Sequence, residues 1–164
     1  MTFTTDRIAN PSISSEPVPV ALAAFNRLST DEKLSLLWVI YDNMGGSITP
    51  AATGVARLQF TQGLLAQVRA LAPEQQLQFM RDLANRSNTA MTRAYGLLTN
   101  NTKLAFWYQL AELMRTGDVI EVPADYALSS TANLVFSTIS ALEFNQQITL
   151  LRQAVVGMGF DPLA

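Results

Sequence analysis

The sequence of 164 residues contains no cysteine and no histidine. Without cysteine there are no disulfides and no thiolate chemistry, and without either residue the commonest zinc sites cannot form. The lack of imidazole also removes the Ser-His and Cys-His pairs that generate nucleophiles. Most enzyme classes are thereby excluded, so we expect a protein that is not an enzyme and that binds no metal.

Charge is also scarce, because charged residues make up 15% of the sequence and the net charge is −2. An average soluble domain has about 25% charged residues. No cluster of lysine or arginine supplies the positive surface that nucleic acids require, so no nucleic-acid partner is predicted. Since the mean hydropathy is +0.17, surplus apolar surface has to be covered by the chain itself, by a partner or by an apolar ligand.

Long apolar runs are missing as well. No run approaches the roughly 18 to 20 residues of a membrane-spanning helix, and the N-terminus has no charged start followed by an apolar signal core. We therefore expect a soluble, cytoplasmic protein without a spanning segment.

The spacing of apolar residues predicts an all-α fold. Residues 1–18 lack a helical period and contain Pro11 and Pro17, which predicts an extended N-terminal arm. In residues 19–164 apolar residues recur at intervals of three and four positions, which predicts a single domain of about eight helices. The predicted helix starts are Ser29 with Glu32, Pro50, Pro73, Asn101 and Ser129, and the predicted stops are Gly45, Gly46 and Gly117.

The chain also resembles itself. The segment "KLSLLWVIYDNM" at 33–44 aligns without a gap on "KLAFWYQLAELM" at 103–114, an offset of 70 residues. Further on, "ALAPEQQLQFMRDL" from residue 70 aligns on "ALEFNQQITLLRQA" from residue 141, an offset of 71. Two matches in the same order predict two related helical halves that bring the two aromatic helices together.

Both aromatic helices carry a stripe of rings and methionines. Trp107 and Met114 lie at helical spacing on the second helix, and Ala111 stands there where the first helix has Tyr41. Core packing is the commoner explanation of such a stripe. The small Ala111 leaves room, however, so a slot for an elongated, ring-bearing apolar ligand is the alternative.

Other side chains give weaker indications. The carboxylates are dispersed and form no acid-base pair, and the glycines form no phosphate loop. Arg152 lies on or beside the apolar face of the last predicted helix. It can extend along the rim of a core, stack on a ring or pair with a partner carboxylate.

Five ordered segments resemble the helical carotenoid proteins of cyanobacteria, which are similar to the N-terminal domain of the orange carotenoid protein. These segments are "LLWVIYDNMGG", "QFMRDLANR", "NTKLAFWYQLAELM", "VPADYALS" and "QQITLLRQAVVGMGF". The resemblance extends from about residue 30 to the end. It implies two four-helix bundles, one of them discontinuous in sequence, with a keto-carotenoid in a tunnel between them.

The resemblance also implies a set of carotenoid-binding residues. The aromatic positions that hold the end ring and flank the polyene are Trp38, Tyr41, Trp107 and Tyr108. The tunnel-lining positions are Leu34, Leu37, Ile40, Leu77, Met80, Asn101, Leu104, Ala111 and Met114. The remaining wall is Val122, Pro123, Ile148, Thr149, Leu151, Arg152 and Val155. Arg152 matches an arginine that, in two-domain relatives, bridges to the C-terminal domain and takes part in docking to the phycobilisome.

The function implied is photoprotection by a bound keto-carotenoid of the canthaxanthin, echinenone or 3'-hydroxyechinenone type, mainly through quenching of singlet oxygen. Carotenoid storage or transfer with a separate C-terminal-domain homologue is a further expectation, and phycobilisome quenching, chloride binding and thylakoid association are weaker ones. Because the sequence stops at Ala164, we expect no interdomain switch. The alternatives are a pigment-free interaction module with an apolar groove and, third, an enzyme.

Overall fold

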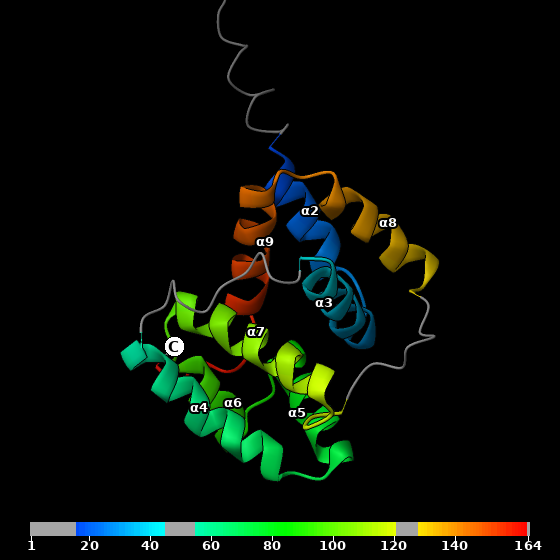
Figure 1. Cartoon of the computed structure of the whole chain (residues 1–164). Coiled ribbons are helices and arrows are strands. Elements are labelled where there is room, and N and C mark those ends of the chain that lie inside the picture. Colours follow the sequence, from blue (N-terminus) through cyan, green and yellow to red (C-terminus); the bar gives the residue numbers. More distant parts are fainter. Residues whose placement is uncertain (1–15, 45–54, 121–127, 164) are drawn as a thin grey trace, which may run out of the picture.

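The computed structural model describes residues 16–44, 55–120 and 128–163, with side chains described from residue 61 onward in the second range. Within these residues all regular structure is helical, which confirms the predicted all-α class (Figure 1). The helices are α2 (Pro17–Asn26), α3 (Thr30–Met44), α4 (Val55–Ala70), α5 (Pro73–Asn85), α6 (Ala90–Gly96), α7 (Asn100–Thr116), α8 (Ser130–Ser140) and α9 (Phe144–Val156).

The helices form two bundles of four. In one bundle α2 packs on α8 and α9 while α3 packs on α8, so this bundle combines the first helices of the described chain with the last. The other bundle is continuous in sequence, because α4 contacts α5, α6 and α7, and α5 contacts α6. Figure 1 shows the discontinuous bundle above the continuous one. The predicted pair of bundles, one of them discontinuous, is therefore confirmed.

The two bundles meet along three helix contacts. Helix α3 of the discontinuous bundle packs on α5 and α7, and α9 of the same bundle packs on α7. The two aromatic helices, α3 and α7, thus contact each other across the boundary between the bundles. This contact is the place where both ring-bearing stripes can contribute to one site.

Helix bounds keep the offsets of the sequence repeat. Helix α7 begins 70 residues after α3, and both ends of α9 lie 71 residues after those of α5. The contact of α3 with α5 has its counterpart in α7 with α9, and that of α3 with α8 has its counterpart in α7 with α4. Aligned segments therefore lie in matching surroundings in the two bundles.

Most predicted helix starts agree with the structure. At α3 the Ser29 backbone N–H donates to Oε1 of Glu32 at 2.9 Å, and the Glu32 N–H donates to the Ser29 hydroxyl at 3.3 Å. Such reciprocal bonds satisfy N–H groups that a helix start otherwise leaves unpaired. Ser129 caps α8 by accepting from the Ala132 N–H at 3.1 Å, and Pro73 is the first residue of α5.

Two predicted boundaries are wrong. Thr99, rather than Asn101, caps α7, because the Thr99 hydroxyl accepts from the Thr102 N–H at 3.3 Å and Asn101 already lies in the first turn. Helix α2 begins at Pro17, inside the predicted arm, since a proline in a first turn lacks only an N–H that would be unpaired anyway.

The remaining boundary predictions divide between confirmed and undescribed positions. Gly117 ends α7 in the left-handed conformation with φ 84°, as predicted for a stop. Pro50, Gly45, Gly46 and residues 1–15 of the predicted arm lie outside the described residues.

Candidate ligand-binding cavity

A cavity of about 530 Å³ lies where α3, α5 and α7 meet, at the junction of the two bundles. Cavities of roughly 300 to 1,000 Å³ with mostly apolar walls are typical of sites for small molecules and cofactors. The predicted residues that line it are Leu34, Leu37, Trp38, Tyr41, Leu77, Met80, Trp107, Ala111 and Met114. Asp31, Ser35, Arg81 and Ile120 also line it and were not predicted.

Trp107 is held in place by a chain of buried hydrogen bonds. Its indole Nε1 donates to the Tyr95 hydroxyl at 3.0 Å, and that hydroxyl donates to the Val155 carbonyl oxygen at 2.5 Å. Burial raises the pKa of Tyr95 well above its ordinary value, so the phenol stays neutral and keeps its proton for Val155. The rings of Trp107 and Phe106 meet edge to face, with centroids 6.2 Å apart.

The sequence analysis missed Tyr95, although the repeat contains a signal for it. Extending the offset of 70 residues upstream places Tyr95 opposite Phe25. Both side chains are buried in the helix that precedes an aromatic helix. Extending the repeat by one helix toward the N-terminus would therefore have located Tyr95, the residue that orients Trp107.

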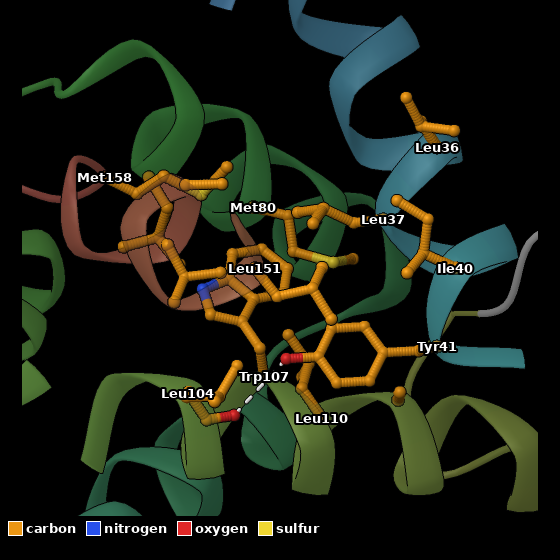
Figure 2. Close-up of a cluster of buried hydrophobic side chains, with 14 of the residues drawn as sticks. Leu36, Leu37, Ile40, Tyr41, Met80, Leu104, Trp107, Leu110, Leu151 and Met158 are labelled. Carbon is orange, nitrogen blue, oxygen red and sulfur yellow. Dashed lines mark hydrogen bonds between the residues drawn. The ribbon is translucent and has the colours of Figure 1, made fainter. Parts of the chain in front are cut away.

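Tyr41 reaches from α3 toward α7 within the cavity. Its hydroxyl donates to the Leu104 carbonyl oxygen across 3.4 Å, a long and therefore weak hydrogen bond. Burial raises the pKa of Tyr41 above its ordinary range. Figure 2 shows its ring next to Trp107 and below Leu37 and Met80. Rings and sulfur thus form one apolar wall contributed by three helices.

Trp38 supplies a second large ring to the same cavity. The guanidinium carbon of Arg115 lies 5.7 Å from the centre of the Trp38 ring, within the range of a cation-π contact. Arg115 is itself paired with Asp42 at 3.0 Å and with Glu112 at 3.4 Å. The Trp38 ring is only partly buried, so packing alone does not fix it. Arg115, held by its two carboxylate partners, helps to keep the ring against the cavity.

The cavity reaches the surface at a polar rim. Nε of Arg81 on α5 lies 2.9 Å from Oδ1 of Asp31 on α3, and Nη2 lies 3.1 Å from Oδ2. The Asp31 bond and charge raise the pKa of Arg81, which stays protonated at every pH of interest. The Arg81 side chain is 38% exposed and the Asp31 side chain is 63% exposed. The pair therefore lies where the cavity opens to the surface.

The unpredicted Ile120 is placed by the buried Gln76. Oε1 of Gln76 accepts from the Ile120 N–H at 2.8 Å, while Nε2 donates to the Val68 carbonyl oxygen at 3.1 Å. The amide therefore fixes the residues after α7 against α4 and α5. Sequence reasoning missed Ile120 because its position depends on this long-range bond and not on any helical period.

Several predicted residues lie outside the lining of this cavity. Ile40 instead lines a separate hollow of about 290 Å³ bounded by α3, α8 and α9. Nε of Arg152 donates to Oδ1 of Asn101 at 2.9 Å, and the Thr149 hydroxyl donates to the Asn145 carbonyl oxygen within α9. Leu104, Leu151 and Val155 are buried in the core, while Tyr108 and Ile148 are partly buried against it. Val122 and Pro123 lie outside the described residues.

Two kinds of feature are missing from the described part of the chain. It contains no group of three or more acidic, histidine or cysteine side chains that could hold a metal ion. Among the same residues, no helix combines the length and apolar character needed to cross a membrane.

The chain matches known proteins over most of its length. The family described as "Orange carotenoid protein, N-terminal" matches residues 11–161. An orange carotenoid-binding domain-containing protein of Nostoc sp. is 48% identical over 170 residues, which cover 100% of this chain and 99% of that relative. The orange carotenoid-binding protein of Synechocystis sp. is 45% identical over 98% of this chain and 51% of its own length, so the chain spans about half of that relative.

Solved structures give the same result. The orange carotenoid protein of Anabaena (Nostoc) sp., binding canthaxanthin, has a TM-score of 0.82 and 46% identity over 88% of this chain and 46% of its own. The red carotenoid protein of the same organism, also binding canthaxanthin, has a TM-score of 0.77 and 40% identity over 89% of this chain and 100% of its own. These sequence and structural matches show that the chain belongs to the family of the orange carotenoid protein N-terminal domain.

Proposed function

We propose that the chain is a water-soluble protein that binds a keto-carotenoid in the cavity between its bundles for photoprotection. The observation that carries this proposal is that Trp38 and Trp107, which come from different bundles, line the same cavity. Relatives that share the fold bind canthaxanthin. A cofactor of the canthaxanthin, echinenone or 3'-hydroxyechinenone type fits walls made of rings, methionines and leucines.

Burial of apolar surface would supply most of the binding free energy of such a ligand. If a polyene removes about 500 Å² of apolar surface from water, the gross gain is on the order of 10 kcal/mol before the costs of association. The flat faces of the tryptophans suit stacking, and Met80 and Met114 adapt to an elongated outline. Ala111, which aligns with Tyr41 in the repeat, is a small residue in this lining and leaves room that a second ring would fill.

Within this proposal the bound carotenoid supplies the photophysics, namely acceptance of energy from singlet oxygen and its release as heat. The chain orients the end ring between aromatic faces and keeps the polyene away from water. We propose a binding role and no catalysis, which agrees with relatives whose names describe carotenoid binding.

The cavity accounts for only part of the predicted tunnel. The predicted residues on the α7 and α9 side, Asn101, Leu104, Tyr108, Ile148 and Arg152, stand 70 or 71 residues after Asp31, Leu34, Trp38, Leu77 and Arg81, which line the cavity. We propose that these residues, with Thr149, Leu151, Val155, Val122, Pro123 and Ile40, complete the wall when the ligand is bound. We also propose that the described helices form one domain of two related halves.

Partners of the complex are a further part of the proposal. A separate C-terminal-domain homologue would serve as a pigment donor or acceptor, which suits storage and transfer. Phycobilisome contact at Arg152 is the weaker proposal, because its Nε is already bonded to Asn101. We also propose that this carotenoid-binding protein is cytoplasmic, with or without contact to the thylakoid.

A variant that fills the cavity tests the proposal. Ala111→Tyr places at this position the residue type that the aligned helix carries at Tyr41. In a host that makes canthaxanthin, the unmodified chain should purify coloured and shorten the lifetime of singlet-oxygen phosphorescence. The variant should be colourless, with unchanged helical circular dichroism, and Leu97→Tyr, at an exposed position away from the cavity, should stay coloured.

The results that contradict the proposal are equally specific. A folded but colourless unmodified chain from such a host would overturn carotenoid binding. If that chain instead captured an amphipathic helical peptide, the interaction-module alternative would take its place.

A further inference from the structure

The cavity is chemically uneven, because its polar groups are gathered at one end. Asp31 and Ser35 lie one turn apart on α3, and Arg81, which lines the same cavity from α5, bonds Asp31. The other lining residues are apolar or aromatic, with Tyr41 already bonded to Leu104. A ligand in this cavity thus meets hydrogen-bonding groups mainly at the Asp31, Ser35 and Arg81 end.

Ser35 is the group that most needs a partner. The residue is 9% exposed, and among the described residues nothing forms a hydrogen bond with its hydroxyl. The great majority of buried side-chain hydroxyls in proteins are hydrogen-bonded. A buried hydroxyl that lines a cavity without a partner therefore indicates a ligand atom that completes it.

Arg81 offers a second donor in a fixed orientation. Asp31 engages Nε and Nη2 in a two-point contact, which fixes the plane of the guanidinium. Nη1 takes no part in that contact. Its N–H groups remain suited to a neutral oxygen at the rim of the cavity.

The aligned residues of α7 and α9 do not repeat this chemistry. At the offset of 70, Ala105 stands in place of Ser35 and Asn101 in place of Asp31. Arg152, which aligns with Arg81, donates to the neutral amide oxygen of Asn101 at 2.9 Å. The hydroxyl and the ion pair are thus specific to the α3 and α5 side, which makes the two directions along the cavity unequal.

We propose, on the basis of the proposed function, that Ser35 and Arg81 bind the oxygen substituent of the carotenoid end ring. The Ser35 hydroxyl donates to the ring carbonyl, and Arg81 supports the same oxygen from the rim. The contact selects oxygenated carotenoids over hydrocarbon ones, and it directs a ligand with one oxygenated ring to place that ring between α3 and α5.

Competition between two carotenoids with the same polyene tests the selectivity. Apoprotein is loaded from an equimolar mixture of canthaxanthin and β-carotene, and the retained pigments are extracted and quantified. We expect the unmodified chain to prefer canthaxanthin and Ser35→Ala to lower the retained ratio about five- to tenfold, the loss of one neutral hydrogen bond. Alanine is a good helix former, so the variant should fold.

A matched control and a spectroscopic measurement separate recognition from a structural effect. Ser137→Ala on the exposed side of α8 should leave the ratio unchanged. With echinenone, which has a single ring carbonyl, the infrared carbonyl stretch should lie at lower frequency in the unmodified complex than in Ser35→Ala. Arg81→Met should move the band in the same direction by a smaller amount.

Several outcomes would overturn the inference. A canthaxanthin to β-carotene ratio that Ser35→Ala changes by less than about twofold, or a carbonyl band indifferent to Ser35, would reject it while leaving carotenoid binding intact. If the unmodified chain retained neither pigment, the proposed function would fail first and the inference with it.

Discussion

At the scale of single residues, the aromatic side of the cavity depends on Tyr95. Its hydroxyl joins the Trp107 indole on α7 to the Val155 carbonyl on α9, and all these atoms are buried. A fixed indole presents the same face to a ligand at all times, which lowers the entropy that binding has to overcome. The side chain that orients the ring is therefore as important as the ring itself.

Removal of that hydroxyl should be costly. Tyr95→Phe leaves the Trp107 N–H and one Val155 acceptor site without this partner, and the expected loss is about 1 to 3 kcal/mol in the free energy of unfolding. Urea denaturation of the apoprotein measures it. Tyr41→Phe is the matched comparison and should cost less, since the bond of its hydroxyl to Leu104, the only one within the described residues, is 3.4 Å long. Equal losses in the two variants would contradict this account.

Substitution by alanine should have opposite effects on stability at two glycines. A Cβ at Gly96 would lie 2.1 Å from the Phe160 carbonyl oxygen, whereas one at Gly63 would have nothing within 4 Å. Gly96→Ala should destabilise the protein by about 1 to 3 kcal/mol because the backbone after α9 has to move. Gly63→Ala, in the middle of α4, should stabilise it by about 0.5 to 1 kcal/mol. Thermal and urea unfolding distinguish these signs, and a stabilising Gly96→Ala would be inconsistent with the close approach.

Sequence reasoning named three ring-bearing residues that line the cavity but none of its polar ones. Helical spacing and the resemblance identified Trp38, Tyr41 and Trp107, because apolar lining follows the period of the helix. Ser35 and Arg81 were missed, since a short polar residue in an apolar stripe gives no periodic signal and an ion pair between distant helices depends on the tertiary fold. Their positions follow from the packing of α3 on α5.

At the scale of helices, Glu32 links two helix starts. The Ser129 hydroxyl at the start of α8 donates to one carboxylate oxygen of Glu32, and the Ser29 N–H donates to the other at 2.9 Å. The Ser129 bond, followed by those from Ser29, lowers the pKa of Glu32 below its ordinary value of 4.5. The carboxylate thus ties α3 to α8 in its charged form.

This link predicts a pH dependence of stability. Because the pKa is lower in the folded state, the contribution of Glu32 is complete above its unfolded value of 4.5 and is lost as pH falls through the lowered folded value. The urea midpoints of the unmodified chain and Glu32→Gln should therefore differ by a constant amount above pH 4.5 and converge as the pH falls below that value. Glu74→Gln, in the first turn of α5, is the control, and parallel curves for Glu32→Gln would refute the link.

Helix starts show what sequence can and cannot locate. Ser29 and Ser129 were predicted because their caps are local, each bonding an N–H three residues later. Asn101 was misassigned because Thr99 competes for the same role two residues earlier, and the Asn101 amide instead bonds Arg152 of α9. The local sequence therefore predicted the start of α7 to within two residues. The contact of Asn101 with Arg152, far away in the sequence, left Thr99 as the capping residue.

At the scale of the whole molecule, the cavity is a joint between two bundles. Its lining comes from α3 of the discontinuous bundle, from α5 and α7 of the continuous one, and from Ile120 after α7. The sequence repeat indicated two related halves but did not say how their helices are shared. That arrangement came from the family resemblance, because the pairing of α2 and α3 with α8 and α9 depends on contacts far apart in sequence.

A ligand bound at this joint should hold the bundles together. Saturation with canthaxanthin should raise the midpoint of thermal unfolding, since a ligand that binds only the folded state stabilises by about 2.7 kcal/mol at one hundred times its dissociation constant. Circular dichroism of apo and loaded protein measures the shift. Ala111→Tyr, with its cavity filled, should show none, and an equal shift in that variant would place the pigment elsewhere.

The most direct measurement of the central claim uses the two tryptophans of the chain, both of which line the cavity. Apoprotein is titrated with canthaxanthin while tryptophan fluorescence and pigment absorption are recorded together. Binding between the bundles predicts quenching of the emission of both residues, saturating at one pigment per chain, with a red-shifted absorption band. Pigment uptake that leaves either tryptophan unquenched, or no uptake at all, would contradict the assignment of this cavity as the carotenoid site.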